Sequence, residues 1–217
     1  WTLDCRTDGH GVTEETPWPF LKALDVGYGY TADDGKTFPL RGKGAGLMPR
    51  LEEIYSAFPD RSFLVNFKSR RTEEGEALAT LLNTDPSARK ATFGVYGGME
   101  PTRVAEAKVN GLKGYDKTSL KACLIPYEAY GWTGILPSAC RDTLIAMPIN
   151  LAPYFWGWPN RFLQRMHDAG SEVILVGPYG GSDFTAGIDT PELAASIPKG
   201  FGGYVWTNKI ETMGPLL

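Results

Sequence analysis

The chain has 217 residues, of which 42% are hydrophobic and 22% are charged, and its formal net charge is -3. This length is enough to bury one sizeable core, so we expect a single domain spanning residues 1–217. The slightly acidic balance argues against a nucleic-acid partner, which would require a basic face. No apolar run reaches the roughly 18 residues that a membrane span requires, so we expect no membrane-spanning segment.

Segments that fit strands alternate with segments that fit helices along the chain. The predicted strands are residues 1–6, 62–68, 91–96, 143–149, 172–176 and 203–207. The predicted helices are one that Pro49 opens at its first position, with an acidic pair in its first turn, and residues 73–82, 101–109, 159–169 and 191–196. Residues 119–126 fit a strand or a helix, and the spacing of their apolar residues does not decide between the two.

Strands that alternate with helices and carry near-continuous apolar runs are typical of a parallel sheet. Six or seven such units in 217 residues suit a (β/α) barrel that lacks one unit. A doubly wound open sheet is the structural alternative, but it normally carries a glycine-rich phosphate loop after its first strand. Gly42, Gly44 and Gly46 alternate in a loop without a strand before it, which is only a weak signal for a nucleotide site.

Polar residues at two strand ends predict a binding pocket. Catalytic groups of a parallel barrel lie at the carboxyl ends of its strands and point inward. In the first predicted strand, alternation places Thr2, Asp4 and Arg6 on one face. In the next predicted strand it places Asn66 and Lys68 together. We therefore expect the charged and amide side chains to converge on one pocket that binds an anion, with a structural ion pair as the alternative.

Several short motifs follow one another in a fixed order. They are a Leu-Asp strand with Thr-Asp-Gly after it, residues 24–27, residues 48–53, a strand that ends on Lys68, and residues 207–211. As an ordered set they resemble the glycerophosphodiester phosphodiesterase family over most of the chain. The resemblance implies a TIM (β/α)8 barrel, here without its first strand and one catalytic loop. It also implies hydrolysis of glycerophosphodiesters to an alcohol and glycerol 3-phosphate, with a divalent cation, Ca²⁺ or Mg²⁺, and two histidines as acid and base.

The match to the family's site residues is partial. The family's Glu-x-Asp metal pair falls on residues 2–4, which makes Asp4 the candidate metal ligand. Its Glu-x-Lys strand end falls on residues 66–68, and its Thr-Asp pair falls on residues 207–208. Because Thr2 and Asn66 stand where the family has carboxylates, the cation is in doubt. The candidates for contacting the substrate are Lys68, Arg6, Asn66 and Trp206.

The family's His-Arg-Gly and His-Asp motifs do not occur where the family has them. We therefore expect that residues are missing from this sequence before Trp1 and near Gly9, with a true deletion as the alternative. The acid and the base would then lie outside the sequence. We interpret His10 as a loop histidine and His167 as a solvent-facing residue near a helix end.

Cys123 and Cys140 bracket a loop rich in Pro, Gly and aromatic residues, which a disulfide could close. Buried free thiols are the alternative. A disulfide would favour a periplasmic or secreted protein over a cytoplasmic one. The functional hypothesis is a hydrolase of small-molecule phosphodiesters. The alternatives are a ligand-binding barrel without turnover and another phospholipase, similar to sphingomyelinase D, on the same fold.

Overall fold

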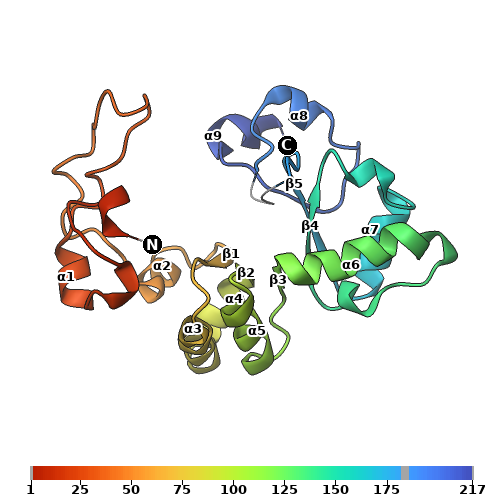
Figure 1. The fold of residues 1–217 in the computed structure, drawn as a ribbon, viewed down its shortest axis with the longest axis horizontal. Coiled ribbons are helices and arrows are strands. Elements are labelled where there is room, and N and C mark those ends of the chain that lie inside the picture. Colours follow the sequence, from red (N-terminus) through yellow and green to blue (C-terminus); the bar gives the residue numbers. More distant parts are fainter. Residues whose placement is uncertain (1, 182–185, 217) are drawn as a thin grey trace. The chain divides into compact units, whose positions relative to one another are not determined.

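The computed structural model describes residues 2–181 and 186–216 (Figure 1). The chain divides into two compact units. The first consists of Trp1–Ser62 and Asp85–Ala91, and the second consists of Phe63–Thr84 and Thr92–Leu217. A single domain over residues 1–217 stays a prediction.

The first unit consists of short helices joined by long loops. Its α-helices are α1 (Trp18–Ala23), α2 (Leu51–Ala57) and α4 (Pro86–Ala91). Its 3-10 helices are η1 (Leu3–Cys5) and η2 (Thr13–Glu15). Two isolated antiparallel bridges, one from Thr2 to Val12 and one from Asp25 to Ala45, hold its loops together.

The prediction of a strand over residues 1–6 is wrong. Leu3–Cys5 form one turn of 3-10 helix. The carbonyl oxygen of Leu3 accepts hydrogen bonds from both the backbone N–H and the hydroxyl of Thr7, at 3.0 and 2.7 Å. Such a turn has no strand alternation, so the shared face predicted for Thr2, Asp4 and Arg6 does not exist. All three side chains are exposed.

The helix after the glycine-rich loop begins two residues later than predicted. Arg50 precedes the first residue of α2, and its backbone N–H donates to the carboxylate of Glu53 at 2.7 Å. Pro49 therefore lies before the helix rather than at its first position. Glu52 and Glu53 lie in the first turn as predicted, where the positive end of the helix dipole stabilises acidic side chains.

The second unit contains two three-stranded parallel sheets. The first has the order β1 (Phe63–Phe67), β2 (Thr92–Gly97) and β3 (Gly114–Asp116). The second has the order β4 (Leu144–Pro148), β5 (Glu172–Val176) and β6 (Tyr204–Val205). The prediction of parallel strands is confirmed, and the five predicted strands from residue 62 onward all occur. The structure adds β3, which the sequence analysis missed.

Helices connect the parallel strands. Those of the second unit are α3 (Thr72–Thr84), α5 (Met99–Lys108), α6 (Lys117–Tyr130), α7 (Asn160–Asp168), α8 (Pro191–Ala195) and α9 (Ile210–Met213). Its 3-10 helices are η3 (Gly131–Thr133), η4 (Ser138–Cys140), η5 (Ala152–Tyr154) and η6 (Gly214–Leu216). Residues 119–126, undecided from the sequence, are helical. None of the helices within the described residues is long and apolar enough to cross a membrane.

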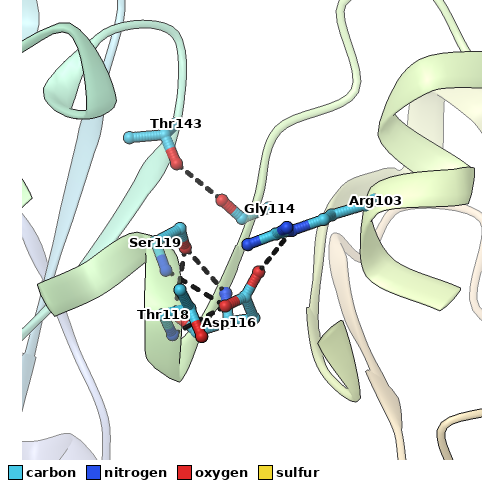
Figure 2. A network of polar contacts seen from close by, with 6 residues as sticks. All are labelled: Arg103, Gly114, Asp116, Thr118, Ser119 and Thr143. Atoms are coloured by element: carbon cyan, nitrogen blue, oxygen red, sulfur yellow. Dashed lines mark hydrogen bonds and ion pairs between the residues drawn. The ribbon is translucent and has the colours of Figure 1, made fainter. Parts of the chain in front are cut away.

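Side chains join the two sheets of the second unit around one core. The hydroxyl of Thr143 donates to the carbonyl oxygen of Gly114 at 2.7 Å, which ties the amino ends of β3 and β4 together (Figure 2). The rings of Phe93 in β2 and Tyr204 in β6 have centroids 4.5 Å apart. Tyr96 and Tyr115 of the first sheet belong to the same buried cluster as Leu144 and Ile145 of the second, so the two sheets share an interior. This shared core does not show a closed barrel.

The disulfide between Cys123 and Cys140 is confirmed. Cys123 lies on α6 and Cys140 on η4, and both side chains are buried in the core. The same core contains Leu144, Ile145, Ala146 and Met147 of β4. The bond therefore fixes α6 to η4, the segment before this buried strand. Cys5 is a free, exposed cysteine.

Candidate functional site

The predicted site residues fall in both units. Asp4 and Arg6 belong to the first unit, whereas Asn66, Lys68 and Trp206 belong to the second. The convergence of these residues on one pocket spans the two units and stays a prediction. Each group is therefore described within its own unit.

Asp4, the candidate metal ligand, is bound by its own loop. Its Oδ1 lies 2.6 Å from Nδ1 of His10, and its Oδ2 accepts a hydrogen bond from the backbone N–H of Gly11 at 3.3 Å. The hydrogen bond with His10 is the main cause that lowers the pKa of Asp4. His10 lies in a loop, as interpreted from the sequence.

The donor set does not fit the cation that the family resemblance implies. Within residues 2–181 and 186–216, no group of three or more His, Cys, Asp or Glu side chains could hold a metal ion. Both oxygens of Asp4 already accept hydrogen bonds, and Asn66 offers an amide where the family has a carboxylate. A hard divalent cation prefers several charged oxygen ligands.

Two of the three alternating glycines, Gly42 and Gly44, bind a carboxylate of the protein itself. Buried Asp25 accepts hydrogen bonds from the backbone N–H groups of Gly42, Gly44 and Gly27, at 2.6, 2.9 and 3.0 Å. The bond from Gly42 is the main cause that lowers the pKa of Asp25. Because these amides already bind an internal anion, the loop is not arranged to hold the phosphates of a nucleotide.

Two predicted substrate-binding residues meet in the second unit. The side-chain amide of Asn66 donates to the hydroxyl of Tyr96 at 2.6 Å. The ring of Tyr96 packs edge-on against Trp206, with centroids 5.4 Å apart, and stacks on Tyr115 at 5.2 Å. We call these four residues the inner cluster. Its members come from β1, β2 and β3 and from the position directly after β6.

The inner cluster lies near the carboxyl ends of the strands. Asn66 pairs in register with Tyr96, and Tyr96 pairs with Tyr115, so the three side chains lie at one level of the sheet. Lys68 follows β1 directly and its side chain is exposed. The structure thus brings Asn66 and Trp206 together and places Lys68 at the same edge.

The sequence analysis did not identify Tyr96 or Tyr115. Tyr96 ends the predicted strand at 91–96, and an aromatic ring with a polar tip at a strand end was a usable signal. Tyr115 gave no such signal, because β3 has only three residues and shows no pattern of its own. Both residues are identified only by the register of the sheet.

A carboxylate also lies beside the position where the family has an aspartate and this chain has Asn208. Asp189 accepts hydrogen bonds from the backbone N–H and the side-chain amide of Asn208, at 2.7 and 3.0 Å. The hydroxyl of Thr207 donates to Asp189 at 2.9 Å. Burial raises the pKa of Asp189, but these hydrogen bonds outweigh it, and the pKa is lowered overall. Asp189 thus places a negative charge after β5, next to the amide that replaces the family's acid.

A basic pocket with a volume of about 350 Å³ opens at the carboxyl edge of β2 and β3. The charged residues that line it are Arg70, Glu100, Asp116, Lys117 and Lys121. Successive residues of a strand point to opposite faces, so Asp116 points away from the inner cluster that contains Tyr115.

Figure 2 shows how Asp116 is held. Its carboxylate accepts hydrogen bonds from the backbone N–H groups of Thr118 and Ser119, at 2.7 and 3.0 Å, and so caps α6. The guanidinium Nε of Arg103 lies 3.2 Å from its other oxygen. Asp116 is only 3% exposed, and the half-exposed guanidinium of Arg103 balances its buried charge.

His167 lies at the opposite ends of the strands. It is exposed near the end of α7, as interpreted from the sequence, and lines a pocket with the amino ends of β5 and β6. Parallel sheets bind their ligands at the carboxyl ends of their strands, not at the amino ends. His167 is therefore not part of the candidate site.

Comparison of the chain with models of protein families finds no match, and comparison with curated proteins finds no match either.

Proposed function

We propose that this protein is a hydrolase of small-molecule phosphodiesters. We further propose that it converts glycerophosphodiesters to an alcohol and glycerol 3-phosphate, and that its strands belong to a TIM barrel. The inner cluster is the observation that carries the proposal. Polar-tipped side chains from three strands and from the residue directly after β6 meet near the carboxyl ends of parallel strands, which is where sheets of this class bind their ligands. The ordered motifs that resemble the phosphodiesterase family support the specific reaction.

In this proposal the strand-end residues hold the phosphate group. Lys68 supplies a positive charge at the end of β1. Asn66 has two amide hydrogens, and one of them donates to Tyr96, which fixes the direction of the other. Trp206 provides an aromatic ring in contact with the ring of Tyr96. These groups would orient the phosphodiester for attack without themselves changing protonation.

The reaction replaces one bond to phosphorus by another. The oxygen of a water molecule bonds to phosphorus, the bond between phosphorus and the alcohol oxygen breaks, and a proton passes to the leaving alcohol. We assign no residue of this chain to the acid or base role. The disulfide supports a proposed location in the periplasm or outside the cell.

The test is an assay of choline release from glycerophosphocholine by the wild-type protein and two variants. Lys68→Met removes the proposed phosphate charge and should lower kcat/KM by about tenfold or more. Lys199→Met is the matched control, because Lys199 is exposed and precedes β6, at the opposite end of that strand. Equal kcat/KM for both variants would remove Lys68 from the site.

A chelator separates the remaining possibilities. Full turnover in excess EDTA would agree with a donor set that does not fit a cation. Loss of turnover in EDTA would instead show that the reaction requires a divalent cation. Binding of glycerophosphocholine without any release of choline would refute hydrolysis and support the ligand-binding alternative.

A further inference from the structure

Helix α6 forms the wall of two adjacent cavities. The first is the basic pocket at its amino end. The second, with a volume of about 180 Å³, is an apolar groove farther along the helix. Lys121 lines both of them, so the two cavities meet at this residue. The apolar walls of the groove are Leu120, Leu124, Ile125, Leu151 and Phe155.

The geometry of α6 aligns the two cavities. Lys117, Lys121 and Ile125 are spaced four residues apart and so lie on one face of the helix. The rise along this stretch is about 12 Å, from eight residues at about 1.5 Å each. A single molecule can therefore extend from the charged end of this face to its apolar part.

The basic pocket carries an excess of positive charge. Arg70, Lys117 and Lys121 contribute three cations, and Glu100 contributes one anion. Asp116 also lines the pocket, but Arg103 balances its charge at 3.2 Å. The N–H groups of Thr118 and Ser119 already bind Asp116, so the cationic side chains rather than the end of the helix would attract a ligand.

The groove leaves apolar side chains exposed beside these cations. Ile125 is 60% exposed, although its neighbours Leu120 and Leu124 are buried at 2% and 7% exposure. Covering exposed aliphatic surface is favourable, and a hydrocarbon chain would do so without needing hydrogen bonds. A headgroup with negative charge complements the adjoining pocket.

We propose that α6 forms a binding site for an anionic amphiphile with one hydrocarbon chain. The phosphate group of the amphiphile occupies the basic pocket near Arg70, Lys117 and Lys121, and the chain lies in the groove along Leu124 and Ile125. This site does not depend on the proposed hydrolysis, because Asp116 and the inner cluster lie on opposite faces of β3.

Isothermal titration of the full chain with dodecyl phosphate, below its micelle concentration, tests the proposal. The comparison probes are inorganic phosphate, which lacks the chain, and dodecyl maltoside, which lacks the charge. Dodecyl phosphate should bind at least about tenfold more tightly than either probe. Lys121→Gln and Ile125→Glu should each weaken it by about tenfold.

Lys199→Gln, an exposed lysine outside both cavities, should leave the affinity unchanged. Lys121 and Ile125 are exposed, and an unchanged thermal midpoint would show that each variant is folded. Three results would overturn the proposal: no binding of dodecyl phosphate, equal binding of dodecyl maltoside, or equal affinities for the Lys121 and Lys199 variants. Inorganic phosphate that binds as tightly as dodecyl phosphate would also overturn it, since the groove would then contribute nothing.

Discussion

Removal of the Cys123–Cys140 disulfide should be among the most damaging changes in the second unit. The two cysteines are 17 residues apart in the sequence. The chain-entropy relation for a closed loop of this length gives a stabilisation of about 3 kcal/mol. Both sulfur atoms lie in the core, at 1% and 0% exposure of their residues, so their removal also takes away packing contacts. The variant Cys123→Ala/Cys140→Ala should therefore lose about 3 kcal/mol or slightly more.

Urea denaturation followed by circular dichroism measures this loss. The control is Cys5→Ala, which removes the free, exposed cysteine and should leave the free energy of unfolding unchanged. Alkylation of the denatured, unreduced wild type should modify Cys5 alone. Modification of three cysteines, or a double variant as stable as the wild type, would show that the bond does not form.

Four further predictions concern single side chains. Gly75→Ala should lower the free energy of unfolding, measured by urea denaturation, by about 1–3 kcal/mol, because the new methyl group would meet the carbonyl oxygen of Pro101 on α5. In an open helix, alanine is more stable than glycine, so a variant more stable than the wild type would contradict this packing. Glu106→Gln should raise the thermal midpoint at pH 7, because burial raises the pKa of Glu106 and the folded state disfavours its charged form. That gain should vanish as the pH falls below the ordinary value of 4.5, and a gain that persists there would contradict the cause. Asp189→Asn should lower the free energy of unfolding at pH 7, because the pKa of Asp189 is lowered in the folded state and its charged form therefore stabilises the fold. This stabilisation is present above the ordinary pKa of 3.8 and is lost as the pH falls through the folded pKa. Equal losses of stability at neutral and strongly acidic pH would refute this reasoning. Tyr96→Phe should lower kcat/KM for the proposed phosphodiester by about fivefold, since Asn66 loses the acceptor that orients it, and unchanged kinetics would exclude the inner cluster from the reaction.

The second sheet was predictable because its strands β4 and β5 are buried on both faces. Residues 144–149 and 173–176 are apolar throughout, and this continuity predicts buried strands whatever surrounds them. Residues 2–6 alternate between polar and apolar side chains, yet Leu3–Cys5 form a 3-10 turn. There the hydrogen bonds from Thr7 to Leu3 and from Gly11 to Asp4 decide the conformation. Local polar contacts of this kind leave no trace in a hydrophobic pattern.

The start of helix α6 carries a capping signal that is visible in the sequence. Asp116 and Ser119 form a capping box, in which the side chain of each residue accepts a hydrogen bond from the backbone N–H of the other. Asp is a preferred N-cap residue, so Asp116 favours a helix start at Lys117 and a helix over residues 119–126. Pro126 lies inside the helix and does not end it.

The candidate site was only partly predictable. Asn66 was chosen near a strand end and Trp206 from inside the last predicted strand, and the structure places both against Tyr96. The basic pocket could not be predicted, because it depends on the register that sets Gly97 beside Asp116. A register between strands that are separated in the sequence by a helix follows from packing rather than from local pattern.

The reaction itself is tested most directly by phosphorus NMR of glycerophosphocholine incubated with the purified protein. The proposed function predicts that the diester resonance is replaced by that of glycerol 3-phosphate, and that Lys68→Met slows this replacement whereas Lys199→Met does not. A diester resonance that persists, or a product resonance from phosphocholine, would contradict the assignment of this chain as a phosphodiesterase that releases glycerol 3-phosphate.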